Sequence, residues 1–212
     1  MRNFVLAALA VLALSASAGA QVTPSLVVHI PDVFLNQSSS PQNGSFDVWV
    51  EEVGGDVGVA SYNLGIHQSP SGLVTFTGAG VSVDHTSLFN NGVVGQVPVD
   101  RTVNNPATFT AGRDIYLTDD FTSGGNPVDA PVDNANRNGL FSVKFTVGAD
   151  VAGSRLLLPE LSPNFLGFFT ATGANVPFTF APGGSITITP VPEPATLGLA
   201  LLGLPLLARR RR

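Results

Sequence analysis

Apolar and polar residues alternate along several short segments of the chain. The clearest of these segments are residues 45–51, 57–67 and 140–147. In the first, Phe46, Val48 and Val50 fall on one side, and polar residues with a single tryptophan fall on the other. Because successive side chains of a strand point to opposite faces, this period of two predicts strands that are buried on one face.

Further short apolar runs are separated by turn residues. They lie at 25–30, 73–77, 81–83, 107–110, 114–117, 155–158, 177–180 and 185–189. Gly, Pro, Asn and Asp stand between them, and no segment of residues 21–190 shows a convincing helical period. About nine short strands of this kind predict an all-β fold, a single antiparallel β-sandwich of the jelly-roll type that occupies residues 21–190.

The N-terminal end differs from this central domain. An arginine precedes an apolar run over residues 4–14. The small residues Ala18 and Ala20 then stand at the −3 and −1 positions before Gln21. This order predicts a secretory signal peptide, residues 1–20, since a permanent anchor would need about 18 or more apolar residues. We therefore expect export by the secretion translocase and cleavage by signal peptidase.

The C-terminal segment, residues 191–212, joins three parts in a fixed order. Pro192, Glu193 and Pro194 come first, an apolar run over 195–208 follows, and Arg209, Arg210, Arg211 and Arg212 stand last. The apolar run can enter a bilayer, whereas the arginines resist translocation and stay on the cytoplasmic side. The prolines disfavour helix and inner-strand geometry, so the Pro-Glu-Pro should be extended and accessible to a protease.

This tail resembles the PEP-CTERM sorting signal of bacterial envelope and matrix proteins. The resemblance implies that the membrane protease-transpeptidase exosortase recognises Pro192, Glu193 and Pro194. It also implies transient anchoring in the inner membrane through a short helix, followed by transfer to the cell surface or extracellular matrix. The alternative is a permanent anchor, but the fourteen apolar residues 195–208 would form a helix of only about 21 Å, against a hydrocarbon core of about 30 Å.

The net charge of the central domain limits the classes of partner that it can bind. Residues 21–190 hold fourteen acidic and five basic side chains, a net charge of about −9. Because a phosphate backbone needs a basic footprint, we expect no nucleic-acid binding and consider cations or polar sugars better partners. The chain has no cysteine, which excludes thiol catalysis and cysteine-based metal sites.

One acid-rich part of the sequence could bind a cation. It contains Asp114, Asp119, Asp120, Asp129 and Asp133. Calcium prefers carboxylate and carbonyl oxygens from flexible loops, which makes these residues candidate ligands of a structural calcium. Their spacing matches no EF-hand loop, however, and aspartate is common in solvated turns, so a set of turns is the simpler interpretation. No other cofactor is expected.

No set of residues is typical of an active site. The histidines at 29, 67 and 85 form no metal-spaced pair, and we expect His67 to be a surface imidazole. No Gly-x-Ser-x-Gly motif occurs, and the adjacent Asp119 and Asp120 would point apart rather than pair for glycosidic chemistry. We therefore predict that the protein is not an enzyme.

Trp49, the single tryptophan, lies out of phase with the apolar face of its strand. If its face is exposed, Trp49 with Tyr62 could stack on a sugar ring, because aromatic rings offer a large flat contact area. If both faces of the sandwich are covered, Trp49 belongs to the core, which is the more common place for tryptophan.

The order of the strand candidates is similar to that of cohesins and carbohydrate-binding modules with jelly-roll sandwiches. The segments that carry the resemblance are 46–50, 59–66, 73–76, 139–147 and 184–188. The resemblance concerns architecture more than partner, since one fold hosts many functions. We expect an exported surface or matrix protein with a structural or adhesive sandwich. The alternatives are a module that binds exopolysaccharide and a cohesin-like module that docks another surface protein.

Overall fold

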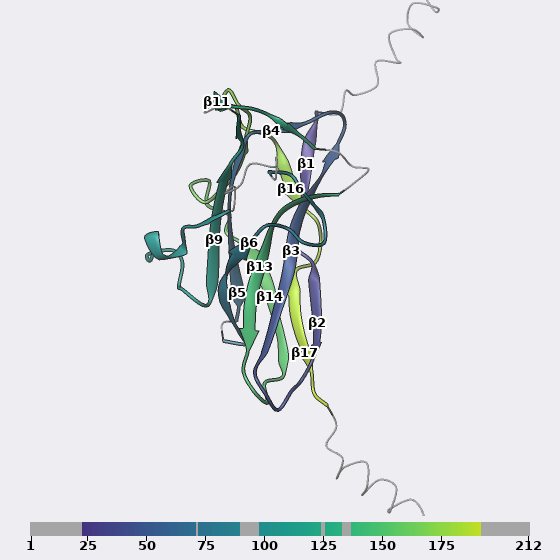
Figure 1. Ribbon diagram of the computed structural model, residues 1–212, viewed down its shortest axis with the longest axis vertical. Helices are drawn as coiled ribbons and strands as arrows, with labels where there is room; N and C mark the ends of the chain where they lie inside the picture. The colour runs from purple at the N-terminus through teal and green to yellow at the C-terminus, as the bar shows by residue number, and fades with distance from the viewer. Residues whose placement is uncertain (1–22, 71, 90–97, 124–125, 133–136, 192–212) are drawn as a thin grey trace, which may run out of the picture.

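Two β-sheets pack face to face in the computed structural model, which describes residues 23–70, 72–89, 98–123, 126–132 and 137–191 (Figure 1). The six-stranded sheet contains β1 (Ser25–His29), β3 (Gln42–Val53), β6 (Val74–Gly80), β7 (Thr86–Ser87), β13 (Asn138–Val147) and β16 (Phe178–Phe180). The seven-stranded sheet contains β2 (Asp32–Asn36), β5 (Ser61–Ser69), β8 (Val99–Asp100), β9 (Asp114–Asp120), β14 (Gly153–Pro159), β15 (Leu166–Phe169) and β17 (Ser185–Thr189). The all-β sandwich is thus confirmed.

Smaller elements complete the described part of the chain. Two short ladders pair β4 (Gly58–Val59) with β12 (Ala130–Pro131) and β10 (Thr122–Ser123) with β11 (Asn126–Pro127). A single 3-10 turn, η1 (Thr102–Asn104), lies beside β9. No helix within the described residues is long and apolar enough to cross a membrane. The expected signal peptide and the expected C-terminal helix lie outside those residues.

The core lies between the inner faces of the two sheets. Their inward side chains are buried, among them Leu26, Val28, Phe46, Val48, Val50, Phe141, Val143 and Phe145 from one sheet and Tyr62, Leu64, Ile66, Ile115, Leu117, Leu157, Ile186 and Ile188 from the other. Alternate residues in the middle of β3 (46, 48 and 50) and of β5 (62, 64 and 66) belong to this set, as the period of two predicts. Each such side chain contributes about 1.5–3 kcal/mol by leaving water.

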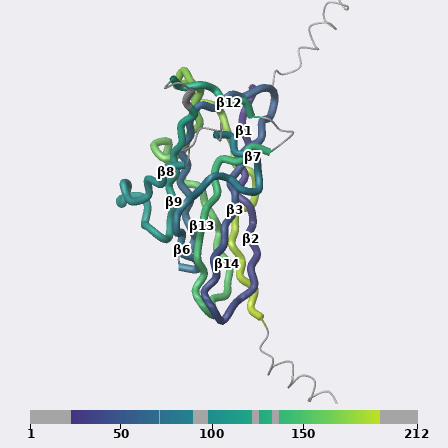
Figure 2. Tube along the Cα trace, viewed as in Figure 1, coloured from purple at the N-terminus to yellow at the C-terminus, as the bar shows by residue number. Residues whose placement is uncertain are grey.

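Near each end of the domain the chain passes from one sheet to the other, first between β1 and β2 and last between β16 and β17. The two crossings lie side by side. β1 belongs to the six-stranded sheet, and after Pro31 the chain continues as β2 in the seven-stranded sheet. β16 runs parallel to β1 (Figure 1), and β17, the yellow segment beside β2 in Figure 2, runs parallel to β2. At the second crossing Gly184 has φ +92°, and a Cβ there would lie 2.9 Å from the carbonyl oxygen of Leu157 and press on Ile30. The expectation of a purely antiparallel sandwich is therefore wrong at this edge.

Two segments expected as strands are covering segments instead. Residues 107–110 lie in turns in which the N–H of Phe109 donates to the carbonyl of Asn105. Residues 81–83 also form no strand and lie over the outer face of the six-stranded sheet. Phe109 is buried by contacts with aromatic rings distant in the sequence, so its apolar character reflects tertiary packing rather than strand formation.

One carboxyl group, that of Asp119, is buried at the inner side of β9. Asp119 is 8% exposed and lies opposite Tyr62 in the ladder of β5 and β9. Burial raises the pKa of Asp119 to about 6; the N–H of Asp120 that donates to it opposes this change, and the Asp120 charge adds to it. The same burial, with the nearby Asp119 charge, raises the pKa of Tyr62 well above its ordinary value.

We predict that Asp119→Asn stabilises the protein at neutral pH but not in acid. The folded state holds the Asp119 proton to higher pH than the unfolded chain does, so stability falls as pH rises from about 4 to about 6. Removing this titration should raise the free energy of unfolding above pH 6 by up to about 3 kcal/mol and change it little below pH 4. Urea unfolding followed by Trp49 fluorescence measures the effect, with the exposed Asp56→Asn as control. Equal effects at both pH values would contradict it.

Candidate functional site

The outer face of the six-stranded sheet is partly covered by the segment 81–89. Asp47, on the outward side of β3, accepts a hydrogen bond from the Ser82 hydroxyl. The N–H groups of Val83 and Asp84 donate to the same carboxylate oxygen, each at 2.8 Å. Burial alone would raise the pKa of Asp47, but these hydrogen bonds outweigh it and hold the pKa below its ordinary value. The Asp47 carboxylate therefore anchors the covering segment.

The ring of Trp49 lies among protein groups on this covered half. His29 stacks on it with ring centres 3.7 Å apart, and His85 stacks on it at 5.2 Å. The Arg137 guanidinium lies 5.1 Å from the same ring centre. Trp49 thus points outward, as its phase indicated, and is half-buried. Its stacking surface is already used within the protein, which leaves little of it for a sugar.

The structure does not bring Tyr62 to Trp49. Tyr62 is 2% exposed and packs in the core against Phe89, Phe141 and Phe168. Its hydroxyl lies 3.4 Å from the carbonyl oxygen of Leu140. The expectation that the two rings form one glycan contact is corrected here, because β5 presents Tyr62 to the interior.

The outer face of the seven-stranded sheet carries a cluster centred on His67. The Nδ1 atom of His67 lies 3.1 Å from Asp114, and the Nε2 atom lies 2.9 Å from Glu160. Asp114 is fully buried and also accepts hydrogen bonds from the Arg113 side chain and the Thr110 N–H. The sequence indicated a surface imidazole, but His67 instead links β5 and β9 to the segment after β14.

Aromatic rings extend this cluster over the same half of the sheet. Phe109 stacks on His67 and on Tyr116, with ring centres 5.0 Å apart in both pairs. Phe165 meets Phe109 edge-on. Gly65 makes this possible, because a Cβ at that position would overlap the Phe109 ring. The covering rings leave β14, β17 and β2 as the open part of the outer face.

An apolar strip occupies this open part. It consists of Phe34, Leu156 and Leu158, which are 72%, 55% and 43% exposed. Thr187 of β17 pairs with Phe34 on one side and with Ser154 on the other, so all these residues share the outward face. The sequence did contain a signal for this strip: residues 156–158 are three consecutive leucines, which cannot all point inward from one strand.

The candidate calcium ligands that the structure describes do not converge. Asp114 is occupied by Arg113 and His67, and Asp119 points to the interior from the far end of β9. Asp129 accepts the N–H of Ala171 at 2.6 Å. Asp120 is exposed at the end of β9, and Asp133 lies outside the described residues. Within the described part of the chain, no three acidic, histidine or cysteine side chains are placed to share a metal ion.

The residues of the two expected processing signals lie outside the described residues. They are Ala18, Ala20, Gln21, Pro192, Glu193, Pro194, Arg209, Arg210, Arg211 and Arg212. Val191, the last described residue, lies two residues after the end of β17 and is exposed.

Comparisons with known proteins relate this chain to others through its fold. No family model and no curated protein matches the sequence. CaCohA2 of Clostridium acetobutylicum is 15% identical with a TM-score of 0.56, over 78% of this chain and 100% of that one. The OlpC cohesin of Clostridium thermocellum, solved in a cohesin–dockerin complex, is 10% identical with a TM-score of 0.50, over 82% and 99% of the two chains. The seventh ScaB type I cohesin of Pseudobacteroides cellulosolvens is 12% identical with a TM-score of 0.50, over 80% and 96%. The sandwich therefore has a cohesin-like fold.

We predict that Glu160→Gln weakens the His67 cluster only above the acid range. Hydrogen bonds from the Ser162 N–H and from His67 lower the pKa of Glu160, and the buried Asp114 also has a lowered pKa. Lowered carboxyl pKa values stabilise the fold above the ordinary carboxyl range, and this contribution is lost as pH falls below about 4.

The free energy of unfolding of the variant should be lower than that of the wild type by on the order of 1 kcal/mol at pH 6. The two values should become equal near pH 3. Urea unfolding at a series of pH values measures the difference in the free energy of unfolding at pH 6 and near pH 3. The exposed Asp56→Asn serves again as the control and should follow the wild type throughout. A constant loss at all pH values would instead indicate that Glu160 contributes by packing.

Proposed function

We propose that the protein is an exported, non-enzymatic surface protein whose cohesin-like sandwich docks a partner protein. The observation that carries this proposal is the apolar strip on the open half of the seven-stranded sheet. Large apolar side chains that point outward from a sheet are unfavourably exposed to water in the free protein, and they are typical of interaction surfaces. The cohesin–dockerin complex of OlpC supports docking as a use of this fold.

The surroundings of the strip indicate the chemistry of the partner. Asp32 lies two residues before Phe34 on the same face, and Glu160 lies two residues after Leu158. Ser154 and Thr187, which share a hydrogen bond of 2.8 Å, stand between the apolar side chains. Together with the acidic excess of residues 21–190, this border favours a protein segment whose apolar side chains are flanked by lysine or arginine.

We predict that Leu156→Asp combined with Leu158→Asp removes partner binding. The partner is first captured by the full-length chain from the host envelope, then purified and titrated by calorimetry. Two apolar side chains buried at about 1.5–3 kcal/mol each imply an affinity loss of at least about 100-fold. The matched control is Val103→Asp, a 70% exposed position beside β9, which should retain the wild-type affinity.

All three substituted side chains are exposed, so the thermal unfolding midpoints should stay close to the wild-type value. An unchanged affinity of the double variant would place docking elsewhere. A purified partner that binds without apolar and basic side chains at its contact would refute the chemistry proposed for it.

Export and sorting form the second part of the proposed function. The motivation is the order of signals in the sequence: the cleavage motif around Ala18 and Ala20, and the Pro-Glu-Pro, apolar and arginine parts of residues 191–212. In this proposal exosortase cuts near Pro192–Pro194, Arg209–Arg212 fix the topology of the tail, and the sandwich then joins the surface or matrix. The membrane contact is transient because the apolar run is short for a stable span.

We predict that the mature protein begins at Gln21 and ends near Pro192–Pro194. Intact-mass spectrometry of the protein from the membrane and from the extracellular matrix of its host tests this. Replacing Arg209–Arg212 by serine should reduce retention and processing, because the tail would no longer be held on the cytoplasmic side. A species that still carries Arg212 and is found only in the membrane would indicate a permanent anchor and refute the sorting proposal.

A further inference from the structure

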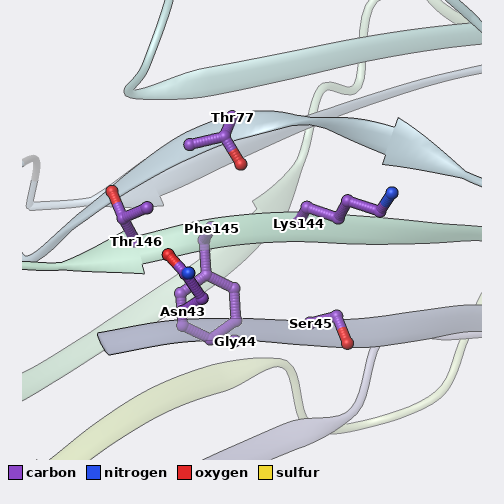
Figure 3. A pocket seen from close by; sticks show the side chains of 7 residues that line it. All are labelled: Asn43, Gly44, Ser45, Thr77, Lys144, Phe145 and Thr146. Atoms are coloured by element: carbon purple, nitrogen blue, oxygen red, sulfur yellow. The ribbon is translucent and has the colours of Figure 1, made fainter. Parts of the chain in front are cut away.

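A hollow bordered by polar side chains lies on the open half of the six-stranded sheet, on the face opposite to the core. Figure 3 shows the side chains that line it on three adjacent strands. The polar ones are Asn43 and Ser45 of β3, Thr77 of β6, and Lys144 and Thr146 of β13. The hollow has a volume of about 600 Å³, which is in the range of small-ligand sites. It belongs to the other sheet from the apolar strip.

Glycines shape the hollow by leaving out side chains. A Cβ at Gly44 would overlap the Phe145 ring, so the absence of a side chain lets this ring close the floor from the core side. On β6, the end of the Lys144 side chain lies beside Gly80, at ordinary contact distance (3.6 Å) from Nζ to the position that a Cβ would occupy. The hollow is therefore built into the sheet and needs no rearrangement to form.

Lys144 gives the hollow its charge. It is the only lysine of the chain, is exposed, and forms no ion pair within the described residues. Arg101, Arg137 and Arg155 also lack an ion pair among the described residues, but Lys144 is the one basic side chain that lines the hollow. Its side chain extends along the edge of the hollow (Figure 3), and the other four polar residues line the rest with hydroxyl and amide groups that both donate and accept hydrogen bonds.

We propose that this hollow binds a uronate-bearing saccharide. The Lys144 ammonium donates to the sugar carboxylate in a charge-assisted hydrogen bond, and the hydroxyl and amide side chains bind the ring hydroxyls. A sugar suits the hollow better than a peptide. β3 and β13 are inner strands with partners on both sides, and on the edge strand β6 the N–H of Phe76 already donates to the carbonyl of Gly112. Little backbone is therefore free to pair with an added peptide strand.

The acidic excess of the domain limits which uronate polymers bind. A polymer with a carboxylate on every ring would be repelled, whereas isolated carboxylates are screened from distant charges beyond about 8 Å at physiological ionic strength. The probe is therefore a hyaluronan hexasaccharide, in which uronates alternate with neutral sugars. Fully N-acetylated chitohexaose is the neutral counterpart, and hexaglutamate is the acidic peptide.

The single lysine permits a direct test on the full-length chain. N-hydroxysuccinimide acetate acylates Lys144, and peptide mass spectrometry measures the rate. We expect saturating hyaluronan hexasaccharide to slow the acylation at least about fivefold, and chitohexaose or hexaglutamate to leave it unchanged. Protection by hexaglutamate equal to that by hyaluronan, or no protection by hyaluronan, would overturn the proposal.

Two variants distinguish the effect of Lys144 in the hollow from the effect of removing one positive charge anywhere on the protein. Lys144→Met keeps the apolar stem and should weaken hyaluronan binding about tenfold in calorimetry, the loss of one charge-assisted hydrogen bond. Arg101→Met removes the same charge at an exposed position outside the hollow and should bind like the wild type. Equal losses in both would show a general charge effect and refute the site. In the variant that combines Leu156→Asp with Leu158→Asp, hyaluronan hexasaccharide should still slow the acylation of Lys144. Saccharide binding is therefore tested independently of protein docking.

Discussion

The crossing of the first and last strands between the sheets is the contact on which the sandwich depends. Pro31 ends β1 and directs the chain into the second sheet, and the backbone at Gly184 lets the last strand follow the same course. The parallel ladders that result pair one edge of each sheet with the same two segments. Both sheets therefore have a fixed relative position, which is what keeps their apolar inner faces in register.

The outer faces of the two sheets are covered in the same way. A buried carboxylate, Asp47 on one sheet and Asp114 on the other, holds a covering segment against the strands. A ring stack then extends the cover, through Trp49 on the first sheet and through Phe109 on the second. Each cover leaves half of its face open. The open halves differ in chemistry, since one is apolar and the other is polar with a single cation.

Local pattern was sufficient to predict the fold class and the two faces of its best strands. The alternation around Val48 and Val50 correctly indicated which side is buried and that Trp49 points outward. The covers could not be predicted, because they depend on contacts between distant residues such as Ser82 with Asp47 and Glu160 with His67. Such contacts leave no periodic trace in the sequence. The proposed processing signals are local motifs, so order and composition alone are enough to predict them, and they stay predictions.

The direction of the terminal strands bears on how the domain responds to force. β1 starts at one end of the long axis and β17 finishes at the other, and they belong to parallel ladders (Figure 1). Tension applied through the two ends of the domain pulls the partner strands past each other, so their hydrogen bonds are loaded together rather than broken one after another. A sandwich connected in this way resists stretching through geometry, in addition to any resistance that its core provides.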